Sequence, residues 1–118
     1  MRGVKNKRKN TRSAVWEDIK ATLDVSDPSA TKGRGKMIVK GRVKDIGAQG
    51  MFFVSADVVP MDAKADIVID FNPEQPGNLI LAAEGKTIRK DAEGVGIRFT
   101  RIDLRRLQQC ITARMNRS

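Results

Sequence analysis

Two short segments carry the residues most suited to binding chemistry. Arg8 and Arg12 lie four positions apart in a stretch without acidic residues, and Asp45 begins a segment that contains Gly47 and Gly50. The planar fork of arginine can bond phosphate oxygens or the O6 and N7 edge of guanine, and a carboxylate accepts hydrogen bonds. Together these residue types predict a ligand that carries both phosphates and guanine bases.

Alternation of apolar and polar residues predicts the strands that must position these segments. The clearest strand spans 37–44 and leads directly into Asp45. The same reasoning predicts strands at 51–54, 65–71, 78–89 with a bend near Gly85, and 95–99. Residues 15–23 fit a strand or a short helix, and we favour a strand because the rest of the pattern is β. Residues rich in Asp, Ser, Pro and Gly predict loops or turns at 24–35, 55–64, 72–77 and 91–94.

The period changes to that of a helix from about Asp103, which can cap its start. Leu104, Leu107 and Ile111 would share its apolar face and pack on the strands. Six short strands followed by one amphipathic helix predict a mostly β fold, a six-stranded antiparallel β-barrel with a C-terminal α-helix. We expect residues 1–12 to form a flexible basic arm and residues 13–118 to form the barrel domain.

The charge of the chain is concentrated at its two ends. The formal net charge is +9, and residues 1–12 alone carry six Lys or Arg and no acidic residue. Residues 101–118 carry five Arg and one Asp, so the body between the two ends is nearly neutral. Basic ends of this kind indicate an anionic partner.

The composition also excludes several classes of function. The chain has no histidine, which excludes imidazole catalysis and most zinc sites, and it has neither a phosphate-binding P-loop nor a recognisable nucleophile–base pair. The single cysteine, Cys110, excludes an internal disulfide and is typical of a reducing cytoplasm; we expect it to be a small core residue. No apolar run is long enough to span a bilayer, and no secretory signal is evident. We therefore expect a cytoplasmic protein that is not an enzyme and holds no metal or cofactor.

The order of these motifs resembles that of the PilZ domain family, small β-barrel receptors for the bacterial second messenger cyclic di-GMP. Arg8 and Arg12 match the family's RxxxR segment, which precedes the barrel. Asp45 and Gly50 match the first and last positions of its (D/N)xSxxG turn, whereas Gly47 stands where the family pattern has serine.

The resemblance covers nearly the whole chain, from about residue 8 to the carboxyl end. The segment 94–99 is similar to the GxGxRF-type final strand of the family, and a helix follows it. Residues 55–71 are similar to the family's connection and next strand. The order and spacing of the motifs carry more weight than RxxxR alone, which any basic tail can contain.

The resemblance implies a role for each matching residue. Arg8 and Arg12 would fold over cyclic di-GMP, and Asp45 would accept hydrogen bonds from N1–H and N2–H₂ of guanine. Gly50 would supply a tight backbone geometry, such as a positive φ. Arg98, on the polar side of the last strand, would be a third cation at the barrel surface.

The implied function is a receptor that changes the conformation of its arm on binding and regulates a downstream protein in bacterial motility or biofilm formation. The protein would be a monomer or a ligand-dependent dimer. Because Gly47 lacks the serine hydroxyl, whose hydrogen bond is worth about 1 kcal/mol, we expect binding to be weakened about fivefold rather than lost.

Two alternatives remain open on the sequence. The first is a divergent PilZ-like domain that binds proteins and has weak or no nucleotide binding. The second is a basic nucleic-acid-binding barrel. The composition argues against it, because such sites stack bases on aromatic side chains and the chain has only four Phe, one Trp and no Tyr.

Overall fold

The computed structural model describes residues 13–14, 18–26, 36–75 and 77–116. The predictions for Arg8, Arg12 and the rest of the arm lie outside these residues, as does the beginning of segment 15–23. No helix within the described ranges is long and apolar enough to cross a membrane.

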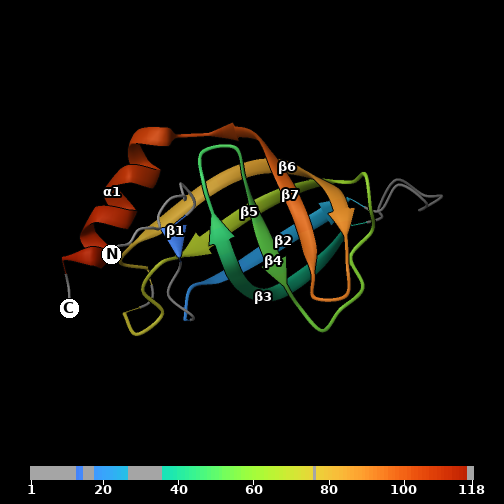
Figure 1. Ribbon diagram of the computed structural model, residues 1–118, viewed down its shortest axis with the longest axis horizontal. Helices are drawn as coiled ribbons and strands as arrows, with labels where there is room; N and C mark the ends of the chain where they lie inside the picture. The colour runs from blue at the N-terminus through green and yellow to red at the C-terminus, as the bar shows by residue number, and fades with distance from the viewer. Residues whose placement is uncertain (1–12, 15–17, 27–35, 76, 117–118) are drawn as a thin grey trace, which may run out of the picture.

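The strands form one closed antiparallel barrel (Figure 1). Hydrogen bonding joins β3, β2, β5, β6, β7 and β4 in that order, and the pairing of β3 with β4 closes the ring; the short β1 pairs with the end of β3. The predicted six-stranded antiparallel barrel with a C-terminal helix is confirmed. The strands span Ser13–Ala14 (β1), Lys20–Ser26 (β2), Lys36–Ile46 (β3), Gly50–Val54 (β4), Lys64–Asp70 (β5), Ile80–Lys90 (β6) and Val95–Ile102 (β7).

Of the strand expected at 15–23, the described residues show β2 from Lys20 onward, and β2 extends further toward the carboxyl end than its composition indicated. The loop expected from Asp24 was wrong at its start, because Asp24 and Ser26 belong to β2. Val25 between them is completely buried, and the three residues pair with β3 on one side. Ladder hydrogen bonds and the burial of Val25 outweigh the turn preference of Asp and Ser.

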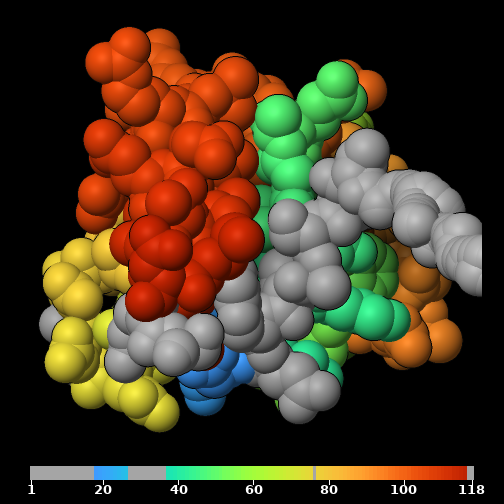
Figure 2. All heavy atoms as spheres, turned by 60° about the vertical axis from the view of Figure 1, so that its left-hand side comes forward, coloured from blue at the N-terminus to red at the C-terminus, as the bar shows by residue number. Residues whose placement is uncertain are grey.

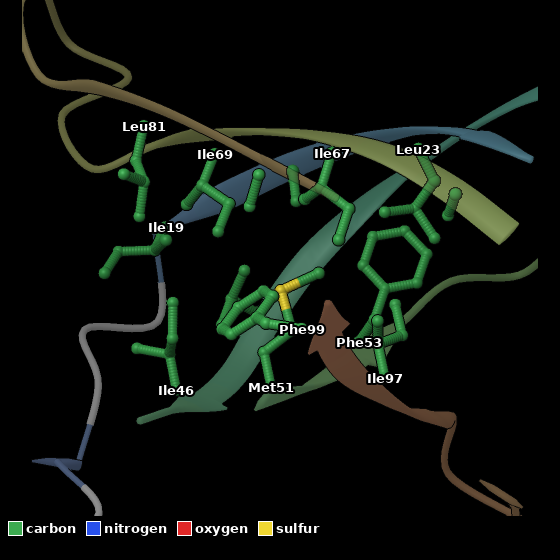
Figure 3. Close-up of a cluster of buried hydrophobic side chains, with 14 of the residues drawn as sticks. Ile19, Leu23, Ile46, Met51, Phe53, Ile67, Ile69, Leu81, Ile97 and Phe99 are labelled. Atoms are coloured by element: carbon green, nitrogen blue, oxygen red, sulfur yellow. The ribbon is translucent and has the colours of Figure 1, made fainter. Parts of the chain in front are cut away.

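The core lies inside the barrel and is built from the inward-facing residues of every long strand. Figure 3 shows Leu23, Phe53, Ile67 and Ile97 from four different strands pointing toward one another. All four side chains are at most 2% exposed. Removal of each such side chain from water stabilises the folded state by roughly 1.5–3 kcal/mol. The packed core therefore keeps the barrel closed, and the closed barrel holds the outer surface in a fixed geometry.

One extra residue in β3 decides which way Asp45 faces. Val43 pairs with Phe53 and Asp45 with Phe52, so Lys44 is a bulge with no partner of its own in β4. Without this bulge, strict alternation would place Asp45 on the inner face with Val43. Ile46 instead takes the inward position opposite Met51, and both are buried in the core.

A second bulge, in β6, has the same effect on Arg89. Thr87 pairs with Ile97 and Arg89 with Gly96, so Ile88 is the extra residue. Thr87 is fully buried, and alternation would have turned Arg89 inward as well. Both Ile88 and Arg89 are exposed.

The helix α1, Leu104–Met115, begins after the predicted cap, since the Asp103 carboxylate accepts the Arg106 backbone N–H at 3.0 Å. Its buried residues are Leu107 and Cys110, which confirms the expected core role of the cysteine. The expectation that Leu104 packs on the barrel was wrong, because it is 52% exposed. The first turn docks instead through a polar contact, in which Arg106 Nε donates to the Ile80 carbonyl at 3.1 Å.

The last turn of α1 also contacts the barrel end. Arg114 Nη1 donates to the Phe71 carbonyl at 2.6 Å, just after β5 ends. Figure 2 shows the helix (red) beside the segment between β5 and β6 (yellow). The helix therefore lies against the end of the sheet near β5 and β6, and its residues do not line the cavity at the β3–β4 turn described next.

Candidate functional site

A cavity of about 650 Å³ opens on the outer surface of the barrel, where the turn between β3 and β4 meets β6 and β7. This volume lies within the range of about 300–1,000 Å³ that is typical of small-ligand sites. Four of the residues singled out from the sequence line it, namely Asp45, Gly47, Gly50 and Arg98. Segments some fifty residues apart in the sequence are thus brought to one place by the pairing of β4 with β7.

The turn itself is held by backbone hydrogen bonds on both sides. Gly47 N–H donates to the Gly50 carbonyl at 2.9 Å, and Phe99 N–H donates to the Gln49 carbonyl at 2.8 Å. The second bond fixes the turn to the final strand, β7. The floor of the cavity is therefore preorganised backbone, which reduces the entropy that a ligand must remove on binding.

Gly50 is required by a close approach of two strands. A Cβ atom at this position would lie 2.3 Å from the Ile97 carbonyl oxygen, which no side chain tolerates. The positive φ expected for Gly50 was wrong, because among the described glycines only Gly77 has one. The glycine at the end of the turn thus allows β4 to pack against β7.

Asp45 lies at the point where the amino-terminal segment joins the barrel. It is half-buried, and it pairs with Phe52 on one side and with Ala14 of β1 on the other. Ser13 pairs with Ile46, so the chain enters the barrel directly beside the turn. Arg12 precedes Ser13 in the sequence, but its own position and that of Arg8 lie outside the described residues.

Two arginines lie on the outer face beside the turn. Arg98 is exposed and pairs directly with Gly50, and Arg89 is exposed and pairs with Gly96. Because neither glycine has a side chain, the surface between the two guanidiniums is hollow. The sequence analysis did not single out Arg89, and the only available signal was the break in alternation at Ile88.

A family model for the PilZ domain matches residues 6–113. The chain belongs to the PilZ domain family. This match includes the RxxxR segment, the turn and most of α1. PilZ domains form a family of cyclic di-GMP receptors. A search of curated proteins found no match.

Gly47 occupies the position at which the resemblance to the (D/N)xSxxG turn leads us to expect serine. A Cβ atom built there meets nothing within 4 Å, and its φ is not positive. A serine would therefore fit without strain, so the glycine is not imposed by the fold. The barrel therefore does not require the absence of a side chain at this position.

Phe52 of β4 forms one wall of the cavity at the turn, and the side chain of Lys44 lies over the Phe52 ring. The Lys44 Nζ atom lies 5.8 Å from the centre of the Phe52 ring and forms an ion pair with Glu93. The hydrogen bond from Lys44 to Glu93, and then the negative charge of that residue, raise the pKa of the lysine above its usual value. Lys44 is therefore charged and held toward Glu93, and it does not line the cavity itself.

The charged residues that line the cavity are Asp45, Arg89 and Arg98. They present one anionic acceptor and two cationic forks to the same space. Such a set suits a ligand that carries negative charge and also offers N–H donors. A guanine nucleotide has both properties, since its base edge donates and its phosphates are anionic.

Proposed function

We propose that this PilZ domain is a cyclic di-GMP receptor that binds the dinucleotide between its amino-terminal arm and the Asp45–Gly50 turn. The observation that carries the proposal is the cavity at the turn, which combines a carboxylate with two arginines at the place where β1 enters the barrel. The family match supports the class of ligand.

The proposed roles follow from the chemistry of each group. Asp45 accepts hydrogen bonds from N1–H and N2–H₂ of one guanine, as a pairing base would. Arg8 and Arg12 bind phosphate oxygens and the O6 and N7 edge of guanine, and their planar forks can also stack on a purine. Arg98 adds positive charge on the opposite wall, and Gly47 leaves one hydrogen bond of the family pattern unmade.

The position of β1 suggests how binding would be transmitted. Ser13 and Ala14 pair with the same end of β3 that carries Asp45. Residues 8 and 12 are only a few positions ahead of this pairing, so a ligand at the turn lies within their reach. Ordering of the arm over the ligand would change the surface presented to a downstream protein, which is the proposed regulatory output.

Titration calorimetry with cyclic di-GMP at low salt tests the proposal. We expect saturable binding, and we expect Arg8→Ala/Arg12→Ala to weaken it more than about tenfold, because hydrogen bonds to charged groups contribute roughly 1.5–3 kcal/mol each. The matched control is Lys5→Ala/Lys7→Ala, which removes the same charge from the arm but leaves RxxxR intact. If tens of micromolar cyclic di-GMP produce no heat with the unaltered chain, the binding free energy is weaker than on the order of −6 kcal/mol. That result contradicts the proposal.

Gly47 supports a second candidate, a divergent PilZ domain that acts through protein contacts with little or no nucleotide binding. Gly47 has open space around it and no side chain, so the hydroxyl group expected at this position of the motif is absent. On this alternative Arg8→Ala/Arg12→Ala leaves partner binding unchanged. A pull-down of the downstream protein with and without cyclic di-GMP separates the two candidates.

A further inference from the structure

A second cavity, of about 590 Å³, lies on the outer face of β2 and β3 and at the end of β4. Among the described residues that line it, the charged ones are Lys20, Lys40 and Arg42, and none is acidic. It shares no residue with the cavity at the Asp45 turn. The two cavities lie on either side of the bulge at Lys44, so β3 contributes to both.

The three cations occupy adjacent positions on one face. Lys20 pairs directly with Arg42 across β2 and β3, and Thr22 pairs with Lys40 in the next outward-facing position. Directly opposite residues have Cβ atoms about 4.5–5.5 Å apart, so three long side chains here can converge on one anionic group. This arrangement favours a compact phosphate over an extended acidic peptide, which would need cations in a row along its length.

The Lys20–Arg42 pair is unfavourable as it stands, because like charges directly opposite one another destabilise a sheet. Over the described ranges, none of Lys20, Lys40 and Arg42 forms an ion pair, although Lys20 lies opposite Asp70 on its other side. The Asp70 Oδ1 atom accepts the Asn72 backbone N–H at 2.9 Å. The repulsion between Lys20 and Arg42 is therefore not balanced by a bridging acid in the cavity.

A comparable pair elsewhere on the barrel shows the usual solution. Lys64 and Lys86 lie directly opposite each other on β5 and β6, but Lys86 pairs with Asp62 at 3.1 Å. The cavity at β2 and β3 has no such partner among its lining residues and instead has hollow space above the cations.

The polar groups beside the cations suit an oxyanion. Thr22 contributes a hydroxyl to the lining, and Ser55 shapes the opposite rim. The Ser55 hydroxyl is already engaged, since it donates to the Lys40 carbonyl at 3.0 Å and accepts the Asp57 N–H at 3.1 Å. These bonds fix the rim next to Lys40, and Thr22 remains as the hydroxyl donor.

We propose that this cavity, hereafter the Lys20–Arg42 cavity, is a second anion site that binds a small phosphate-bearing ligand independently of the Asp45 turn. The Arg42 fork and the two lysine ammonium groups would contact the phosphate oxygens, with the Thr22 hydroxyl as a further donor. The volume is that of a small-molecule site, and its position leaves both sites accessible at once.

The test uses inorganic pyrophosphate as the probe and the full chain carrying Arg8→Ala/Arg12→Ala, so that the arm does not contribute. Nuclear magnetic resonance follows the titration, and the changes in chemical shift of the backbone amides locate the binding site. We expect the backbone amides of Thr22, Gly41 and Ser55 to shift together and to saturate, while those of Gly47 and Gly50 stay unchanged.

A charge-matched pair of variants gives the decisive comparison. Lys40→Gln/Arg42→Gln should weaken pyrophosphate at least about tenfold, because it removes two charge-assisted contacts. Lys64→Gln/Lys86→Gln removes the same amount of positive charge from the pair on β5 and β6. It should leave the affinity for pyrophosphate unchanged. Equal losses in both variants would show general charge attraction and would overturn the proposal.

Three further results would also overturn it. The first is a response to sulfate at equal ionic strength that equals the response to pyrophosphate. The second is a response confined to the turn residues, and the third is binding of single-stranded RNA without binding of pyrophosphate. These experiments contain no cyclic di-GMP, so a negative result does not bear on the receptor proposal. Conversely, a chain that fails to bind cyclic di-GMP can still bind pyrophosphate in the Lys20–Arg42 cavity.

Discussion

Arg114 near the end of α1 binds Asp18 through both carboxylate oxygens, with the Nη2 atom 2.9 Å from each. The side chain of Arg114 is only 14% exposed, and that of Asp18 is 40% exposed. Asp18 lies between β1 and β2, so the contact joins the helix to the segment that leads from the arm into the barrel. This ion pair thus links the carboxyl-terminal helix to the segment that precedes β2.

We expect Asp18→Asn to destabilise the fold by about 1–3 kcal/mol, because it removes the negative charge that pairs with a mostly buried guanidinium. Urea unfolding at neutral pH measures the change. The control is Glu93→Gln, which removes the exposed partner of Lys44 and should have a smaller effect, because solvent screens exposed ion pairs. Equal effects of the two variants would show that the helix contact has no special importance.

We expect Gly50→Ala to lower the free energy of unfolding by about 1–3 kcal/mol or more, because the new methyl group would collide with the Ile97 carbonyl oxygen. Thermal unfolding followed by circular dichroism is a suitable measurement. Gly47→Ala in the same turn serves as the control, since space is open there, and it should be neutral or stabilising by about 0.4–1 kcal/mol. A Gly50→Ala protein as stable as the unaltered chain contradicts this interpretation of the close approach.

We expect Gly47→Ser to tighten cyclic di-GMP binding about fivefold, because it restores one neutral hydrogen bond worth about 1 kcal/mol. The open space around Gly47 allows the side chain without a shift of the barrel. Calorimetric titration of Gly47→Ser and Gly47→Ala separates the effect of the hydroxyl group on affinity from the effect of reduced backbone freedom. If alanine raises the affinity as much as serine does, a stiffer turn explains the gain and the hydroxyl has no role.

Burial raises the pKa of the Cys110 thiol above its usual value of 9.0, and the nearby charge of Arg106 opposes this shift. A group with a raised folded pKa stabilises the fold below its unfolded pKa and loses this contribution as the pH rises through the folded value. We therefore expect the stability difference between the unaltered chain and Cys110→Ala to shrink above pH 9.0. Unfolding of both proteins by urea at neutral and at alkaline pH measures this, and a difference independent of pH would contradict it.

The barrel was predictable because its strands alternate regularly. Val39 and Val43 on β3, and Ile67 and Ile69 on β5, are buried as the period-two pattern requires. The end of β2 was missed because Asp24 and Ser26 favour turns, while the ladder that holds them involves strands distant in sequence. Leu104 was misplaced because a helical stripe does not reveal where a helix begins to contact the sheet.

The candidate site was only partly predictable, for a geometric reason. The turn residues were found through their motif, but the break in alternation at Ile88 was the only local signal for Arg89, and it did not indicate a shared cavity. Its outward position depends on a bulge at Ile88, which arises from the pairing of β6 with β7. The roles of Arg8, Arg12, Asp45 and the other expected ligand contacts remain predictions that the titrations will test.

The single extra residues at Lys44 and Ile88 are positions at which a strand can lose one residue without changing which side chains face outward. Deletion of Lys44 would leave Val43 opposite Phe53, Asp45 opposite Phe52 and Ile46 opposite Met51, so the strand would become regular with Asp45 still on the outer face. Such a deletion would remove the exposed Lys44 and its contacts with Phe52 and Glu93. Gaps at these two positions in an alignment of PilZ sequences would therefore still place matching residues on the outer face.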